Sequence, residues 1–65
     1  MAVTAKAYRE KRAGIVKEAR TFLEANEKDW TADRQGTYDK MLSECSDLLA
    51  KATQVENLEK AEASL

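Results

Sequence analysis

The chain has 65 residues, 43% of them hydrophobic, but 11 of the hydrophobic residues are alanines. One cysteine and no histidine exclude an intrachain disulfide and a Cys/His zinc site. Eleven basic residues against 12 acidic ones give a net charge of −1, which disfavours a nucleic-acid partner. Chains this short usually need a crosslink or a partner for stability, so oligomerisation is the expected source of stability.

The charge is unevenly distributed along the chain. Residues 1–20 carry a net charge of +4 and residues 21–65 a net charge of −5, so we expect the two parts to attract each other or another copy. No apolar run approaches the roughly 20 residues that cross a bilayer, and the N-terminus lacks the apolar core of a secretory signal. The sequence therefore predicts a soluble, intracellular protein without a membrane partner.

The first predicted element is an amphipathic helix over about 4–26. Its apolar positions are separated by three, four or seven residues, as on one face of a helix. They are Ala5, Tyr8, Ile15, Val16, Ala19, Phe22 and Leu23. Arg12 interrupts this stripe, and we expect its guanidinium to reach an acidic neighbour, Asp47, while its stem covers apolar surface.

A turn is predicted over about 27–31. Asn26 can end the first helix in the left-handed conformation, and Thr31 is a favourable N-cap for the second. Arg34 stands where a complete capping box would have Glu or Gln. Trp30 is expected to cover the end of the hairpin against Leu23 or Phe22.

The second predicted helix covers about 32–63 and continues the same apolar period. Its stripe consists of Tyr38, Met41, Leu42, Cys45, Leu48, Leu49, Ala52, Val55, Leu58 and Leu65. Two helices joined by a short turn fold back antiparallel, so the sequence predicts one all-α domain over residues 1–65, a two-helix hairpin. At 1.5 Å per residue the second helix is the longer by two to three turns.

The end of the longer helix would carry apolar residues with no first-helix partner. We therefore expect coiled-coil self-association, or continuation into a part of the protein absent from this sequence. The residues predicted to self-associate are Leu48, Leu49, Ala52, Val55 and Leu58. The oligomer number, and whether helices exchange between subunits, stay open at this point.

The sequence has few residues that could perform catalysis or bind a metal. Cys45 lies on the apolar stripe and is expected to be a core residue, and the acids lie along an exposed helix face. The sequence thus predicts neither an enzyme nor a cofactor or metal site. Four bases on one side of the first helix could contact an acidic partner or, less in keeping with the net charge, nucleic acid: Lys6, Arg9, Lys17 and Arg20.

Several segments share order and spacing with a known family. These are Y-R-E-K-R-A at 8–13, the I-V…E-A-R…F-L-E pattern at 15–24, W-T-A-D-R-Q at 30–35 and Y-D…M-L-S-E at 38–44. Together they resemble the N-terminal scaffolding (delta) domain of tailed-bacteriophage major capsid proteins. That family has an L-R-E-K-R-A helix, a short break and an L-T-x-E-E-Q helix that continues as a coiled coil.

The resemblance implies a non-enzymatic assembly module that guides coat-protein association in the procapsid by weak helix–helix contacts. It also implies the procapsid interior in the bacterial host cytoplasm as the location, and the capsid shell domain and a phage protease as partners besides further copies. The alternative from another class is a small regulatory or adaptor hairpin that binds one heterologous protein. Self-association of the isolated chain discriminates between the two.

Overall fold

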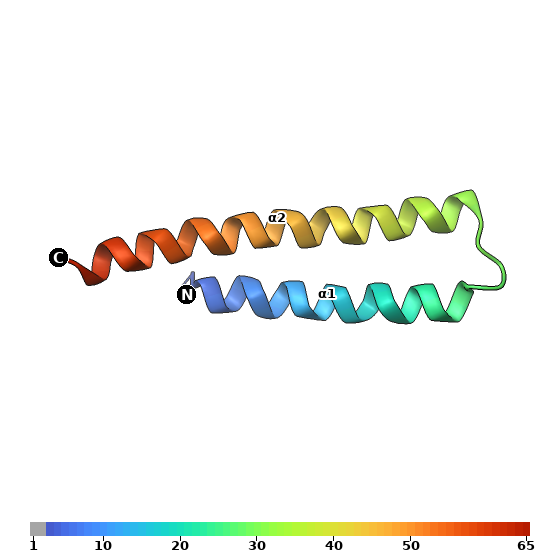
Figure 1. Cartoon of the computed structure of the whole chain (residues 1–65), viewed down its shortest axis with the longest axis horizontal. Helices are drawn as coiled ribbons and strands as arrows, with labels where there is room; N and C mark the ends of the chain where they lie inside the picture. The colour runs from blue at the N-terminus through green and yellow to red at the C-terminus, as the bar shows by residue number, and fades with distance from the viewer. Residues whose placement is uncertain (1–2) are drawn as a thin grey trace.

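The computed structural model describes residues 3–65, which form two antiparallel α-helices. Helix α1 spans Ala5–Asn26 and helix α2 spans Ala32–Ala63. The turn lies at one end of a rod of 54 × 17 × 15 Å, and α2 extends past the beginning of α1 at the other end (Figure 1). The prediction of an all-α antiparallel hairpin with a longer second helix is confirmed.

Threonine side chains cap the beginning of both helices. The Oγ1 atom of Thr4 accepts a hydrogen bond from the backbone N–H of Ala7 at 3.1 Å. Thr31 does the same for the N–H of Arg34 at 3.3 Å. Both threonines have extended backbone angles, as N-cap residues do. The N-cap predicted at Thr31 is therefore confirmed.

The end of α1 differs from the prediction. No residue within 3–65 has a positive φ, so Asn26 is not left-handed. Its side-chain amide instead donates a hydrogen bond to the carbonyl of Phe22 at 2.9 Å, and its own carbonyl accepts from the N–H of Asp29 at 3.0 Å. These bonds satisfy carbonyls of the last turn, so the helix ends without a left-handed residue.

The fully buried core consists of small side chains only. Its members are Ala5, Ala19, Cys45 and Ala52, which are between 1% and 7% exposed. Ala5 and Ala19 are two heptads apart on α1, and Cys45 and Ala52 are one heptad apart on α2. Small residues at these positions form the central line of the contact, and the larger apolar side chains lie on either side of it.

The larger apolar residues fall on two sides of this central line, and the heptad spacing sorts them. On one side, which we call the closed side, all of these residues are half-buried: Tyr8, Ile15, Phe22, Met41, Leu48 and Val55. The other side, which we call the open side, consists of Val16, Leu23, Leu42 and Leu49. On the open side, Val16 is 45%, Leu42 44% and Leu49 46% exposed, and only Leu23 is half-buried.

Candidate interaction surface

Three aromatic rings close the turn end of the hairpin. The ring of Trp30 lies 5.7 Å from that of Phe22 and 5.8 Å from that of Tyr38, edge-to-face in both cases. The indole N–H donates a hydrogen bond to the Oε1 atom of Gln35 at 2.7 Å. The expected covering of this end by Trp30 is confirmed, with Phe22 as the partner on α1.

Arg34 stabilises the turn through contacts with Asp29, which the sequence pattern did not predict. Its guanidinium pairs with the Asp29 carboxylate at 2.8 Å and also donates to the Asp29 backbone carbonyl. The residue that breaks the capping-box pattern therefore holds the turn to the first turn of α2. The signal in the sequence was an arginine placed five residues after an aspartate, across the N-cap.

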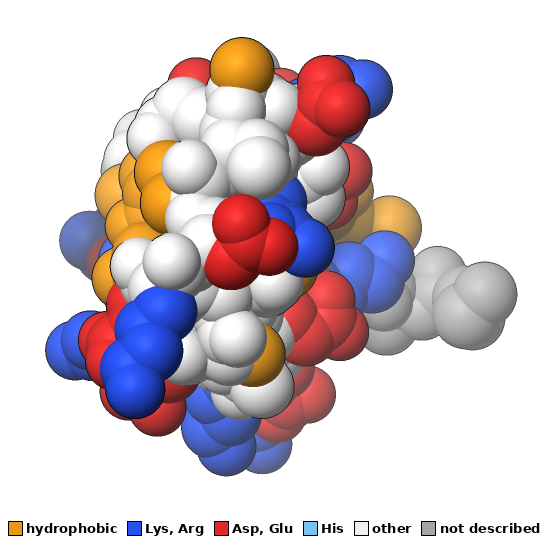
Figure 2. Space-filling model, turned by 90° about the vertical axis from the view of Figure 1, so that its right-hand side faces the viewer, with side chains coloured by type: hydrophobic (Ala, Val, Ile, Leu, Met, Phe, Trp, Pro, Cys, Tyr) orange, Lys and Arg blue, Asp and Glu red, His pale blue; other side chains and the backbone are white. Residues whose placement is uncertain are grey.

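The open side forms a shallow groove between the helices. Three open-side residues line it, Val16, Leu23 and Leu42, together with Ala19, Arg20 and Tyr38, and Leu49 lies outside it, farther from the turn. A separate hollow across the central line is lined by Phe22 and Met41 of the closed side. Seen from the turn end, hydrophobic side chains gather at the left edge, with a few more elsewhere, and charged side chains are scattered among uncharged polar side chains and backbone over the rest (Figure 2).

The five residues predicted to self-associate do not share one face of the hairpin. Ala52 is 1% exposed at the contact between the helices. Leu48 and Val55 are half-buried on the closed side, whereas Leu49 lies on the open side and Leu58, 59% exposed, lies beyond both. The hairpin itself therefore covers much of the surface that the periodicity assigned to another chain.

Polar contacts reach from α1 to the last third of α2. The backbone N–H of Ala5 donates to the Oε1 atom of Glu59 at 3.4 Å, and Arg9 forms an ion pair with Glu56. Glu56 also pairs with Lys60 at 3.3 Å, at the spacing of four residues that favours ion pairs on a helix. These contacts fasten the beginning of α1 to α2 and leave Leu58 and the fully exposed Leu65 as the large apolar residues of the extension.

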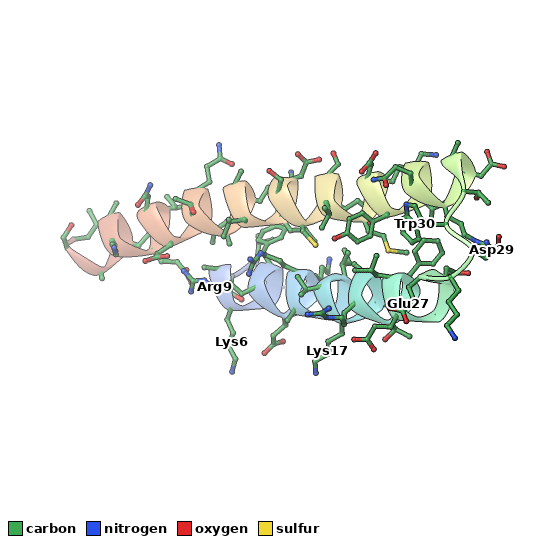
Figure 3. All side chains as sticks on the ribbon, turned by 45° about the vertical axis from the view of Figure 1, so that its right-hand side comes forward. Lys6, Arg9, Lys17, Glu27, Asp29 and Trp30 are labelled. Atoms are coloured by element: carbon green, nitrogen blue, oxygen red, sulfur yellow. The ribbon has the colours of Figure 1, made fainter. Side chains whose placement is uncertain are left out.

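The four predicted basic residues divide into two kinds. Arg9 is paired with Glu56, and Arg20 lies 3.6 Å from Glu24 on its own helix. Lys6 and Lys17 point away from α2 into solvent, whereas Arg9 lies toward the neighbouring helix (Figure 3). The basic side of α1 is therefore partly neutralised within the hairpin, which weakens it as a site for an acidic partner.

Two further expectations concern the middle of the contact. Cys45 is a buried core residue, as expected, and its Sγ atom is 3.9 Å from the carbonyl oxygen of Arg12. The expected ion pair between Arg12 and Asp47 is absent among residues 3–65. Arg12 lies on the central line, level with Cys45, so its half-buried stem serves packing while Arg9 makes the inter-helix pair.

The ion pairs at Glu56 have an electrostatic consequence. The hydrogen bond from Lys60, together with the positive charge of Arg9, lowers the pKa of the Glu56 carboxyl below its usual 4.5. The carboxyl group is solvent-exposed, so this is a surface network that links the two helices.

Within residues 3–65 there is no group of three His, Cys, Asp or Glu side chains placed to hold a metal ion. The same part of the chain has no helix with the length and hydropathy needed to cross a bilayer. No protein-family model, curated protein or solved structure matches this chain. The described surface has two hollows, the larger one lined by Phe22 and Met41 and the smaller one on the open side. The open side differs in carrying large aliphatic residues that are more than 40% exposed.

Proposed function

We propose that this chain is a non-enzymatic assembly module that works by weak, reversible helix–helix contacts. The observation that carries the proposal is the open side, where three large aliphatic residues of a 65-residue protein are each 44–46% exposed. An apolar strip of this kind on a small helical protein is typical of an interaction surface. The proposed chemistry is association, not catalysis.

The dimensions of the hairpin support the same proposal. Its radius of gyration is 15.5 Å, whereas a compact chain of this length would have about 11 Å. A two-helix rod cannot enclose large side chains, and its buried core contains only small ones. Such a fold gains stability by packing against further helices.

We extend the proposal to the biological role that the resemblance to the phage scaffolding domain implies. In this role the chain guides coat-protein association inside the procapsid, and the capsid shell domain is its partner. Weak contacts suit this role because wrongly placed subunits can dissociate before the shell is complete.

Sedimentation equilibrium of the chain from about 5 to 500 µM, with circular dichroism at each concentration, tests the proposal. We expect the average mass to rise with concentration, and helicity to rise with it. A chain that stays monomeric and fully helical throughout would contradict the proposal. The regulatory or adaptor hairpin with a heterologous partner would then be the better account.

A further inference from the structure

We propose that a second copy of this chain covers the open side, and that the two hairpins form an antiparallel four-helix bundle about a two-fold axis parallel to the helices. The inference rests on the proposed function and specifies the surface and geometry of association. In this bundle α1 of one copy packs against α2 of the other, next to Val16, Leu42 and Leu49.

The first argument is the amount of surface left exposed. The hairpin has a solvent-accessible surface of 5214 Å², whereas a compact monomer of its mass exposes about 4,200 Å². The excess of about 1,000 Å² is close to the roughly 800 Å² that each partner buries in a standard protein interface. One further hairpin is therefore an occupant of suitable size.

The second argument is the nature of the residues that border the open side. Close to the level of Cys45 it is bordered by Ala13 on α1 and Ser46 on α2; each lies three or four residues from an open-side residue, and both are exposed. These side chains are small, so another helix can approach closely. Near the same level the closed side is bordered by Lys11 and Glu44, whose charged groups would have to lose water if a partner packed there. The open side also has charged border residues, such as Arg20 and Asp39, but they lie farther from Cys45 along the rod.

The third argument is charge complementarity at one level of the rod. The carbonyl oxygen of Arg12 is 3.9 Å from the Sγ atom of Cys45, so these two residues lie at the same height along the rod. Asp39 lies six residues before Cys45, so it is level with a position six residues after Arg12, within two residues of Arg20. Both Arg20 and Asp39 are exposed at the borders of the open side. The pair of Arg20 with Glu24 on its own helix is long, at 3.6 Å, and solvent-exposed, so the Arg20 guanidinium can also bind the Asp39 carboxylate of another copy.

A two-fold axis parallel to the helices keeps every residue at its own level. It therefore places Arg20 of each copy beside Asp39 of the other, which gives two equivalent ion pairs across the interface. Every neighbouring pair of helices in the resulting bundle is antiparallel, as within the hairpin. An axis perpendicular to the helices would bring α1 against α1 and lose both pairs.

Charge reversal tests this geometry because the two-fold axis predicts that Arg20 of each copy lies beside Asp39 of the other. Arg20→Glu alone places Glu beside Asp39 at both contacts, and Asp39→Arg alone places Arg beside Arg20 at both. We expect each variant to dissociate about tenfold more readily than the unmodified chain, through the loss of attraction and the gain of repulsion at two sites. An equal mixture of the two variants restores both ion pairs in a heterodimer, so its association returns to near the original strength.

The apolar part of the surface is tested with a matched pair of leucines. Leu49→Gln alters the open side, and Leu58→Gln alters the extension, where Leu58 is 59% exposed. We expect the first change to abolish association at concentrations where the unmodified chain dimerises, and the second to leave it intact. Circular dichroism of both variants shows whether the hairpin is still folded.

The outcomes separate this inference from the proposed function. If the unmodified chain never exceeds the monomer mass, both fail. If it associates, but Leu58→Gln disrupts the association and Leu49→Gln does not, the assembly proposal stands and the open-side interface is wrong. If the charge variants each weaken association but their mixture does not recover it, the four-helix geometry is overturned.

Discussion

The two sides of the hairpin are built from residues of similar hydrophobicity, yet they differ in how well they are covered. All six closed-side residues are half-buried, whereas three of the four open-side residues are nearly half exposed. The closed side includes Tyr8, Phe22 and Met41, whose long side chains can lie across the neighbouring helix. The open side has only valine and leucine, which reach less far. The comparison shows that the hairpin covers the side chains of one side more completely than those of the other, and the proposed second copy would cover the exposed ones.

The largest expected effect comes from forcing the two helices apart at the central line between these sides. Ala52 is 1% exposed there, so Ala52→Leu should lower the free energy of unfolding by about 1–3 kcal/mol through overpacking. Urea unfolding monitored by circular dichroism measures the change. Ala50→Leu, at an exposed position of the same helix, is the matched control and should be nearly neutral. Equal effects at both positions would contradict the contact described.

Two neighbouring leucines test the comparison itself. Leu48 is half-buried on the closed side, and Leu49 is 46% exposed on the open side. At a concentration where the chain is monomeric, Leu48→Ala should cost about 1–2 kcal/mol of stability and Leu49→Ala less than about 1 kcal/mol. At high concentration the order of their effects on association should reverse. An identical ranking in stability and in association would remove the distinction between the sides.

The two glycines sharpen the comparison because they lie on neither side. A Cβ atom added at Gly14 or Gly36 would meet nothing within 4 Å, and neither residue has a positive φ. Gly14→Ala and Gly36→Ala should each raise the free energy of unfolding by about 0.5–1 kcal/mol through helix propensity. Thermal unfolding measures the gain. Association should be unchanged, and weaker association in either variant would indicate an interface outside the open side.

The smallest expected effect is the pH dependence of the exposed network at Glu56. Because folding lowers the pKa of this carboxyl below 4.5, its contribution to stability is present above that pH and is lost as the pH falls through the lowered value. Glu56→Gln should therefore show a smaller loss of stability on acidification than the unmodified chain. Denaturant midpoints at pH 7 and pH 3 measure this, and parallel pH profiles of the two proteins would contradict the role of the network.

The two helices and the N-cap of the second were predictable from local sequence features. The three- and four-residue spacing of apolar residues, the N-cap at Thr31 and the position of Trp30 depend on interactions within a few residues or at the end of a short turn. Cys45 was predictable as a core residue because it continues the stripe. These features need no knowledge of how far each helix is rotated about its axis.

Predicting the candidate surface requires knowledge of how each helix is rotated about its axis, so this surface was predictable only in part. Leu48 and Leu49 are adjacent in sequence and both fit the stripe, but the packing of α1 half-buries the first and leaves the second exposed. The ion pair of Arg9 with Glu56, in place of one between Arg12 and Asp47, depends on the reach of long side chains. The sequence pattern favoured a left-handed Asn26 at the end of α1. Asn26 is not left-handed, and its side chain instead hydrogen-bonds the carbonyl of Phe22.

The central claim is that the open side is where this protein meets another copy of itself. A dilution series of amide NMR spectra tests it most directly, because the signals report each residue separately. The account predicts that signals of Val16, Leu42 and Leu49 shift with concentration, while those of Ile15, Met41 and Leu48 move much less. Shifts confined to the region around Leu58, or none over the whole series, would contradict it.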